Sequence, residues 1–133
     1  KLADIIGPLP AYMSATAWMG LLVYGFTAVD SLSTFYLYAV IYGFGYGGVM
    51  TGILISVAML THPSRRAFAM GLVTAFGWLG HANGGYLGGL LFDLTGGHEP
   101  AYGIAAGSAL LNLLVVGTLY LNTRRPKLRA KTA

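Results

Sequence analysis

The sequence predicts an all-α membrane protein with four transmembrane helices. Of its 133 residues, 56% are hydrophobic and only 9% are charged, and the mean hydropathy is +0.66. A soluble domain carries roughly 25% charged residues, so charge is too sparse here to cover a water-exposed surface. Disordered chains are excluded because they are polar and poor in aromatic residues. The apolar residues also gather into four long blocks separated by short polar turns, and the charges lie between those blocks or at their ends.

A short polar turn separates the first two apolar blocks. The first block spans residues 9–29 and begins beside Pro8 and Pro10. Proline lacks a backbone N–H, but in the first turn of a helix that group would have no partner within the helix. Residues 30–33 form the turn, and the second block spans residues 34–60. A spanning helix needs about 20 apolar residues, so the first block fits directly and the second crosses with tilt.

The last two blocks carry clear start and stop signals. Ser64 is a suitable N-cap for a third helix over residues 65–92. The paired glycines at 96–97 end that helix, and the fourth helix is expected over residues 101–121. Residues 1–123 therefore form the predicted transmembrane segment, and residues 124–133 form a basic tail.

The charges predict the orientation of this segment. Lys1 precedes the first helix, residues 65–66 are both arginine, and the other five basic residues follow the fourth helix. All eight thus fall on one side of the membrane. The opposite loops hold only acidic residues among their charged ones: Asp30, Asp93 and Glu99. The positive-inside rule then places both ends of the segment in the cytoplasm, as expected for a multi-pass protein of the cell membrane.

Glycine is abundant, with 20 residues, and many of these sit within the second and third predicted helices. Glycines four residues apart let helix backbones approach closely in lipid, where no hydrophobic force drives helices together. We therefore expect close helix packing at seven positions: Gly43, Gly47, Gly48, Gly52, Gly80, Gly84 and Gly88.

One face of the second predicted helix combines hydroxyl groups with small residues. At about 100° per residue, this face contains Tyr38, Tyr42, Gly45, Val49, Gly52 and Ser56. Such a face suits the wall of a solute cavity. It equally suits a seam between two helices in which tyrosines fill gaps, and the sequence leaves both interpretations open.

The third predicted helix carries His81 near its middle, with Trp78 and several small residues within about 60° of it. Imidazole at membrane depth can carry a proton or hydrogen-bond a polar solute. The alternative is a neutral histidine bonded to a neighbouring helix. Asn83, on the opposite face, and Asn112, in the fourth helix, are expected to make hydrogen bonds between helices.

Enzymes and nucleic-acid-binding proteins are disfavoured by the same sequence. There is no cysteine, no H-E-x-x-H pair, no phosphate loop and no Ser-His-Asp spacing, so we expect no catalytic site, no metal and no cofactor. The glycine-rich run at residues 43–48 lies inside an apolar block without a preceding strand, which argues against dinucleotide binding. Eight basic residues are too few for a nucleic-acid surface.

Two segments resemble the major facilitator superfamily, specifically the last four of its twelve helices. Asp4 and Gly7 match the end of the cytoplasmic loop motif that precedes helix nine, although prolines stand where that motif has basic residues. The run at residues 84–97, G-G-Y-L-G-G-L-L-F-D-L-T-G-G, is similar to the end of helix eleven in monocarboxylate and oxalate/formate-type carriers. By this resemblance the chain is expected to be a fragment.

The resemblance implies a secondary carrier that moves a small solute by alternating access. It implies solute contacts from the second and third helices, and we expect them at His81, Tyr42, Tyr38 and Trp78. An organic anion coupled to protons, or exchanged for another anion, is the expected solute, with any permanent cation supplied by the remaining transporter helices. The alternative is a small helical assembly or anchoring subunit in the bilayer that transports nothing.

Overall fold

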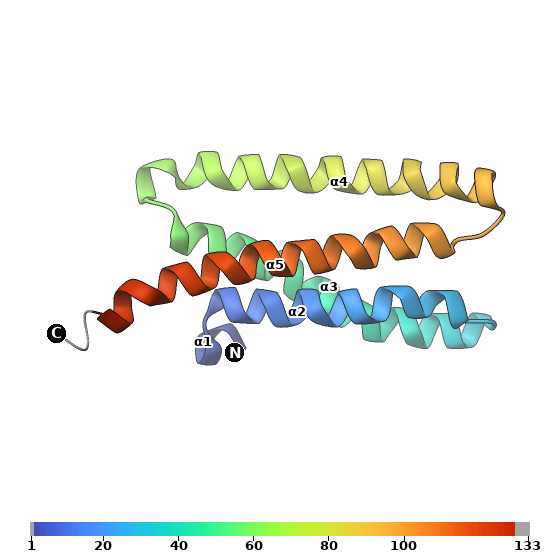
Figure 1. Cartoon of the computed structure of the whole chain (residues 1–133), viewed down its shortest axis with the longest axis horizontal. Helices are drawn as coiled ribbons and strands as arrows, with labels where there is room; N and C mark the ends of the chain where they lie inside the picture. The colour runs from blue at the N-terminus through green and yellow to red at the C-terminus, as the bar shows by residue number, and fades with distance from the viewer. Residues whose placement is uncertain (1, 130–133) are drawn as a thin grey trace.

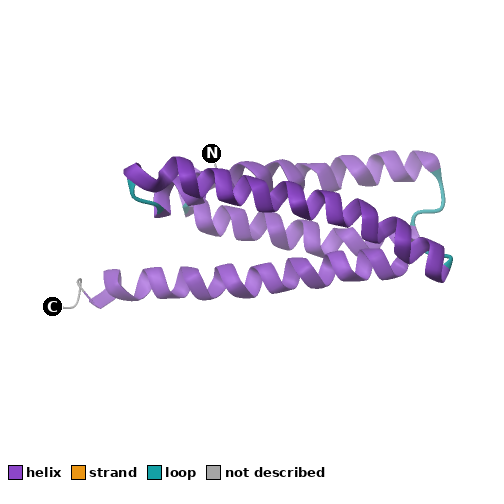
Figure 2. Cartoon of the chain, turned by 90° about the horizontal axis from the view of Figure 1, so that it is seen from above, coloured by secondary structure: helices purple, strands orange, loops and turns teal. Residues whose placement is uncertain are grey.

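The computed structural model describes residues 2–129, and the side chains of residues 3–123. Every element in this described range is helical, as Figure 2 shows. In chain order the elements are α1 (Leu2–Ile6), α2 (Pro8–Val23), the 3-10 helix η1 (Tyr24–Ala28), α3 (Leu32–Leu60), the 3-10 helix η2 (Pro63–Arg65), α4 (Arg66–Thr95) and α5 (Glu99–Arg129). The predicted all-α class is confirmed.

The four long helices run alternately up and down along a common axis (Figure 1). The start of α2, the α3–α4 turn and the far end of α5 lie at one end of the bundle. Helix α2 is the central element because it packs along both α3 and α5. Helix α4 stands apart, and no residue of it is buried.

A glycine with positive φ joins α1 to α2. Gly7 has φ +92°, a conformation that residues with a Cβ rarely adopt. Its N–H donates to Ala3 O at 3.0 Å, and its own carbonyl accepts from Ala11 N at 3.1 Å. The positive φ explains why glycine occupies this position, and the two hydrogen bonds pair the backbone groups of the turn.

The α-helical part of α2 ends at Val23, six residues before the predicted limit of residue 29. The chain continues as η1, a tighter 3-10 helix. Thr27 Oγ1 donates to Tyr24 O at 2.7 Å within η1. The carbonyl of Leu22, at the transition, accepts a hydrogen bond from Tyr38 Oη at 2.6 Å. A side chain of α3 therefore satisfies a backbone group at the point where the winding changes.

The N-termini of α3 and α4 are capped differently. Ser31 caps α3, because its Oγ accepts from Thr34 N at 3.2 Å. Ser64 was expected to cap the third helix, and this is incorrect: its N–H donates to His62 Nδ1, and it lies inside η2. Arg65 is the N-cap of α4 and makes no side-chain cap bond.

Helices α4 and α5 extend beyond their predicted ranges. Gly96 ends α4 with φ +71°, as the paired glycines predicted, but the helix reaches Thr95 rather than residue 92. Helix α5 begins at Glu99 instead of 101, and its backbone continues to Arg129 rather than ending at 121. The expected tail at residues 124–133 is therefore helical over its first six residues, and 130–133 lie outside the described residues.

Within the described residues, two helices rather than four are long and apolar enough to cross a membrane by length and composition. They are α3 and the Glu99–Thr123 part of α5. Helix α2 has only 16 residues before its winding changes, which is too short by this measure. Helix α4 has 30 residues, but His81, Asn83 and its many glycines lower its mean hydropathy. The expectation of four spans therefore holds by these measures for only two helices.

Candidate functional site around His81

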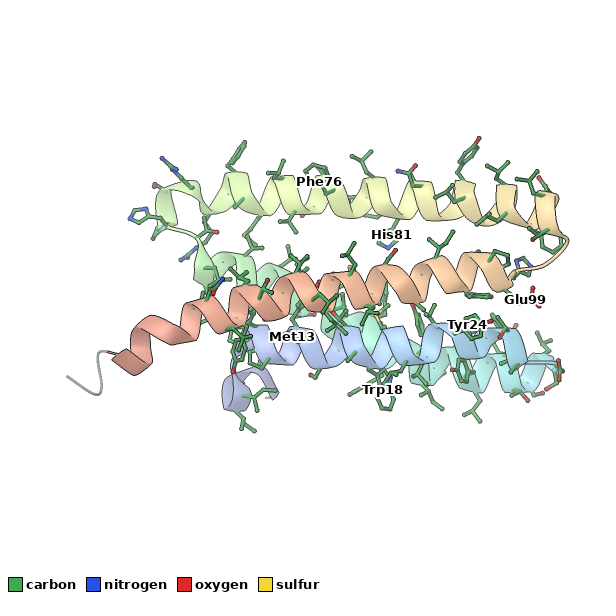
Figure 3. The ribbon with its side chains drawn as sticks, viewed as in Figure 1. Met13, Trp18, Tyr24, Phe76, His81 and Glu99 are labelled. Carbon is green, nitrogen blue, oxygen red and sulfur yellow. The ribbon has the colours of Figure 1, made fainter. Side chains whose placement is uncertain are left out.

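His81 lies on the side of α4 that faces the other helices (Figure 3). Its Nε2 lies 3.1 Å from Tyr46 Oη of α3, within hydrogen-bond distance. Its Nδ1 lies 2.8 Å from the carbonyl oxygen of Gly77, one turn earlier in α4. The imidazole therefore bridges α3 to its own helix, and both ring nitrogens are engaged.

The geometry around His81 determines where its proton lies. A carbonyl oxygen only accepts hydrogen bonds, so Nδ1 carries hydrogen and donates to Gly77 O. In the neutral imidazole Nε2 then has no hydrogen and accepts one from Tyr46 Oη. In the cation both nitrogens donate, and the Tyr46 oxygen becomes the acceptor. Protonation of His81 therefore reverses the direction of this hydrogen bond.

The surroundings of this pair are open. Trp78 lies beside His81 on α4, with 5.8 Å between ring centroids, and is 70% exposed. Tyr46 is 40% exposed, and its ring meets the imidazole edge-on at 6.2 Å. A solute at this surface could contact the indole, the phenol and the imidazole together. We refer to His81, Tyr46 and Trp78 as the imidazole site.

Tyr38 and Tyr42, also expected at the solute, belong to a different group. Both pack edge-on against Phe26 of η1, at centroid distances of 4.8 and 5.3 Å. Phe35 and Tyr102 complete the cluster around Phe26, at 5.6 and 5.9 Å. The structure thus joins two of the four expected residues, His81 and Trp78, and places the other two in an aromatic cluster.

The polar and small face of α3 lies against α2. Gly45, Gly52 and Ser56 are the buried residues of α3. A Cβ at Gly45 would meet Trp18 Cδ1 at 2.6 Å, and one at Gly52 would meet Tyr12 Cβ at 3.1 Å. Of the two interpretations that the sequence left open, the structure therefore favours the helix seam over a continuous cavity wall.

The seven glycines expected at helix contacts divide into two groups. Gly48 and Gly52 lie against α2, with Ala15 and Tyr12 as their respective neighbours. A Cβ on any of the other five would meet nothing within 4 Å: Gly43, Gly47, Gly80, Gly84 and Gly88. The close packing expected at these five is absent from the described residues, and for the three glycines of α4 this follows from the separation of that helix.

The two amide residues behave differently from each other. Asn112 Nδ2 donates to Tyr12 Oη at 2.8 Å and so links α5 to α2, as expected. Asn83 Nδ2 donates instead to Leu79 O at 3.0 Å, one turn back in its own helix. The expected bond between helices is therefore wrong for Asn83, because α4 has few neighbours that an amide could reach.

Sequence reasoning missed Tyr46 and Phe26. Tyr46 follows Tyr42 by four residues, and residues spaced in this way lie only about 40° apart on a helix. That spacing could have placed Tyr46 near the predicted face. Phe26 was treated as part of a continuous helix, and no sequence signal marks the 3-10 turn that orients its ring.

Among the described residues, no group of three or more His, Asp or Glu could hold a metal ion.

Comparison with known proteins decides the family. A sequence model described as Major Facilitator Superfamily matches residues 1–133, the whole chain. The chain belongs to the major facilitator superfamily. No curated protein and no solved structure matched it. Membership makes this a multi-pass membrane protein of a transport family whose members handle small solutes. The superfamily assignment made from residues 4, 7 and 84–97 is confirmed; the match says nothing of the monocarboxylate or oxalate/formate subgroup.

Proposed function

We propose that the chain forms the last four membrane-crossing helices of a secondary transporter for a small organic anion, working by alternating access. Four crossings, with both ends of the segment in the cytoplasm, agree with the up-and-down arrangement of the helices and with basic residues gathered at one end. On this proposal α2 crosses the membrane together with the η1 turn that follows its short α-helical part. Helix α4 crosses despite its lower hydropathy, because neighbouring transporter helices cover its polar and glycine-rich face.

The observation that carries the proposal is the hydrogen bond between His81 and Tyr46, which joins α3 to α4 on an open face. Imidazole is the side chain that ordinarily changes charge between pH 5 and 8. When His81 is neutral, the phenolic hydrogen of Tyr46 is used by Nε2. When His81 is protonated, Nε2 donates to the Tyr46 oxygen, and the phenolic hydrogen turns outward.

This reversal would couple a proton to an anion. The protonated pair offers a positive imidazolium and an outward-pointing phenol donor at one surface, and both favour a carboxylate. The neutral pair offers neither. Because Trp78 is exposed beside them, its ring provides an apolar surface for the remainder of a small organic acid. Binding of the anion and uptake of the proton therefore assist each other, as linkage requires.

The test is solute uptake by the full-length protein in proteoliposomes with an imposed proton gradient, using a panel of radiolabelled mono- and dicarboxylates. Tyr46→Phe keeps the ring but removes the hydroxyl, so we expect uptake to fall about tenfold, as for the loss of a hydrogen bond to a charged group worth roughly 1.5 kcal/mol. His81→Ala should lower uptake further and weaken its dependence on pH.

Tyr86→Phe is the matched control, since Tyr86 lies on α4 and is 69% exposed. It should transport normally. All variants are compared at equal amounts of reconstituted protein, so a folding defect is not mistaken for loss of transport. Normal, pH-dependent uptake by His81→Ala would refute the role of the imidazole site. Absence of any carrier activity in the wild-type protein would favour the non-transporting assembly instead.

A further inference from the structure

A groove separate from the imidazole site is lined mainly by α2, α3 and α5, with Val73 of α4 also at its wall. Its volume is about 500 Å³. Most of its wall is aliphatic, including Leu9, Ile53, Val57, Leu111, Val115 and Leu119. Only three other kinds of group line it: serine hydroxyls, the phenol of Tyr12 and the amide of Asn112. We call it the aliphatic groove.

Ser56 is the unusual residue of this groove. It is only 5% exposed, and its Oγ is buried without a hydrogen-bond partner among the described residues. A serine or threonine inside a helix usually bonds a carbonyl of the preceding turn. Thr16 does so with Tyr12 O at 3.0 Å, and Thr95 with Leu91 O at 2.7 Å. A buried hydroxyl without such a bond calls for a partner from outside the helix.

Tyr12 and Asn112 supply complementary groups in the same groove. Tyr12 Oη accepts a hydrogen bond from Asn112 Nδ2, and the phenol still has its own hydrogen to donate. The Asn112 amide still has a carbonyl oxygen to accept with. Together with the Ser56 hydroxyl, the groove offers both donors and acceptors. None of the described residues that line it is charged.

We propose that the aliphatic groove binds an uncharged amphiphile from the membrane, with a hydroxyl-bearing head at Ser56, Tyr12 and Asn112 and a hydrocarbon tail along the aliphatic wall. A hydroxyl head can donate and accept, which matches the groups present. A carboxylate or ammonium head would be buried without a counter-charge, which is costly. Nothing in this inference depends on transport or on His81.

Its position supports a membrane source. Tyr12 lies four residues after the start of α2, and Ser56 lies four residues before the end of α3. Each is therefore about 6 Å along the axis from its helix end. Both ends lie at the same end of the bundle (Figure 1). The head of a lipid such as a diacylglycerol would lie at this depth, just beneath the membrane surface.

Photolabelling of the full-length protein in phosphatidylcholine nanodiscs tests the inference. The probe is an octanol that carries a diazirine in its chain, and the comparison compound is the same diazirine alkane without the hydroxyl. We expect the octanol to label peptides of α2, α3 and α5 that line the groove at several times the level of the alkane. Equal labelling by both compounds would overturn the proposal.

Ser56→Ala should lower octanol labelling of these peptides by about two- to tenfold, the loss that corresponds to one hydrogen bond. Labelling by the alkane should not change. The matched control is Ser14→Ala, because the Ser14 hydroxyl is already bonded to Ala11 O at 2.9 Å. Unchanged octanol labelling in Ser56→Ala would refute the assignment of the head group to Ser56.

Two further measurements complete the design. Diacylglycerol added to the nanodisc should compete with the octanol, whereas glycerol in the water should not; competition by glycerol alone would overturn the membrane source. The thermal midpoint of Ser56→Ala without probe should match or exceed that of the wild type, because an unpaired hydroxyl is removed. A lower midpoint would show that Ser56 has an internal partner and would contradict the inference.

Discussion

At the scale of single residues, Gly25 leaves no room for a Cβ beside the Tyr38 side chain. A Cβ on Gly25 would overlap the Tyr38 hydroxyl. That hydroxyl in turn bonds Leu22 O. We expect Gly25→Ala to destabilise the protein by about 1–3 kcal/mol, as for other overpacked sites. The free energy of unfolding in mixed detergent micelles, titrated with SDS, measures this.

Gly43→Ala is the control for this substitution, because nothing lies within 4 Å of a Cβ placed there. It should be neutral or stabilise α3 by up to about 1 kcal/mol. Tyr38→Phe alone should cost about 0.5–1.5 kcal/mol through the lost hydrogen bond. It should also reduce the effect of Gly25→Ala, since the overlapping hydroxyl is gone. Strict additivity of the two changes would contradict the proposed contact.

The sequence identified His81 as the central polar residue of its helix, and the structure places it at a bridge between helices. Its partner Tyr46 could not be identified with equal ease. Which tyrosine of α3 meets the imidazole depends on the rotation and depth of one helix against the other. Periodicity along a single helix carries no information about that register. For the same reason Tyr38 and Tyr42 were grouped with His81, although both pack against Phe26.

At the scale of elements, α2 organises the bundle through side-chain hydrogen bonds with its neighbours. Trp18 Nε1 donates to Ile41 O of α3 at 3.0 Å, and Asn112 of α5 donates to Tyr12. In lipid such bonds contribute about 0.6–1.7 kcal/mol each. We therefore expect Asn112→Leu to destabilise the bundle by roughly that amount. A double-mutant cycle with Tyr12→Phe should return a coupling of similar size.

Asn83→Leu provides the comparison, because Asn83 bonds only a carbonyl of its own helix. We expect it to change the unfolding free energy less than Asn112→Leu does. A larger loss at Asn83, or no coupling between Asn112 and Tyr12, would show that α5 is held to α2 in another way. Both variants are measured by the same SDS titration.

The sequence predicted the existence and order of the four long helices well, and their ends less well. Glycine at position 96 acts locally, so its effect could be predicted from neighbours in the chain. The early end of α2 was not predicted, and there the Leu22 carbonyl accepts a hydrogen bond from Tyr38, 16 positions away in the chain. Helix ends determined by distant partners escape local rules.

At the scale of the whole molecule, the up-and-down path separates the basic turn between α3 and α4 from the acidic turn between α2 and α3. The α3–α4 turn and the α2–α3 turn lie at opposite ends of the bundle (Figure 1). We expect Ser64→Cys to react with a membrane-impermeant maleimide only in inside-out vesicles. Ser31→Cys should react in intact cells. Both are introduced singly into full-length protein otherwise free of cysteine, and labelling is read on a gel.

Ser64 and Ser31 are both exposed, so failure to react reports sidedness rather than burial. Labelling of both from the same side would contradict the proposed crossing of the membrane by α3.

The separation of α4 from α2 could not be predicted from sequence. Its glycine pattern is the same whether another helix covers it or not, and only the arrangement in space shows that the face is open.

The 3-10 winding of η1 has a mechanical consequence. A 3-10 helix rises about 2.0 Å per residue and an α-helix about 1.5 Å, so the five residues Tyr24–Ala28 gain roughly 2.5 Å of length. They also add about 100° of rotation, since each residue turns about 120° rather than 100°. Rewinding η1 into α geometry would therefore shorten and rotate this segment. The α2–α3 loop would move toward α2, and Phe26 would rotate away from α3. The Leu22 carbonyl, which would accept from Phe26 N in α geometry, instead accepts a hydrogen bond from Tyr38 Oη in the present winding.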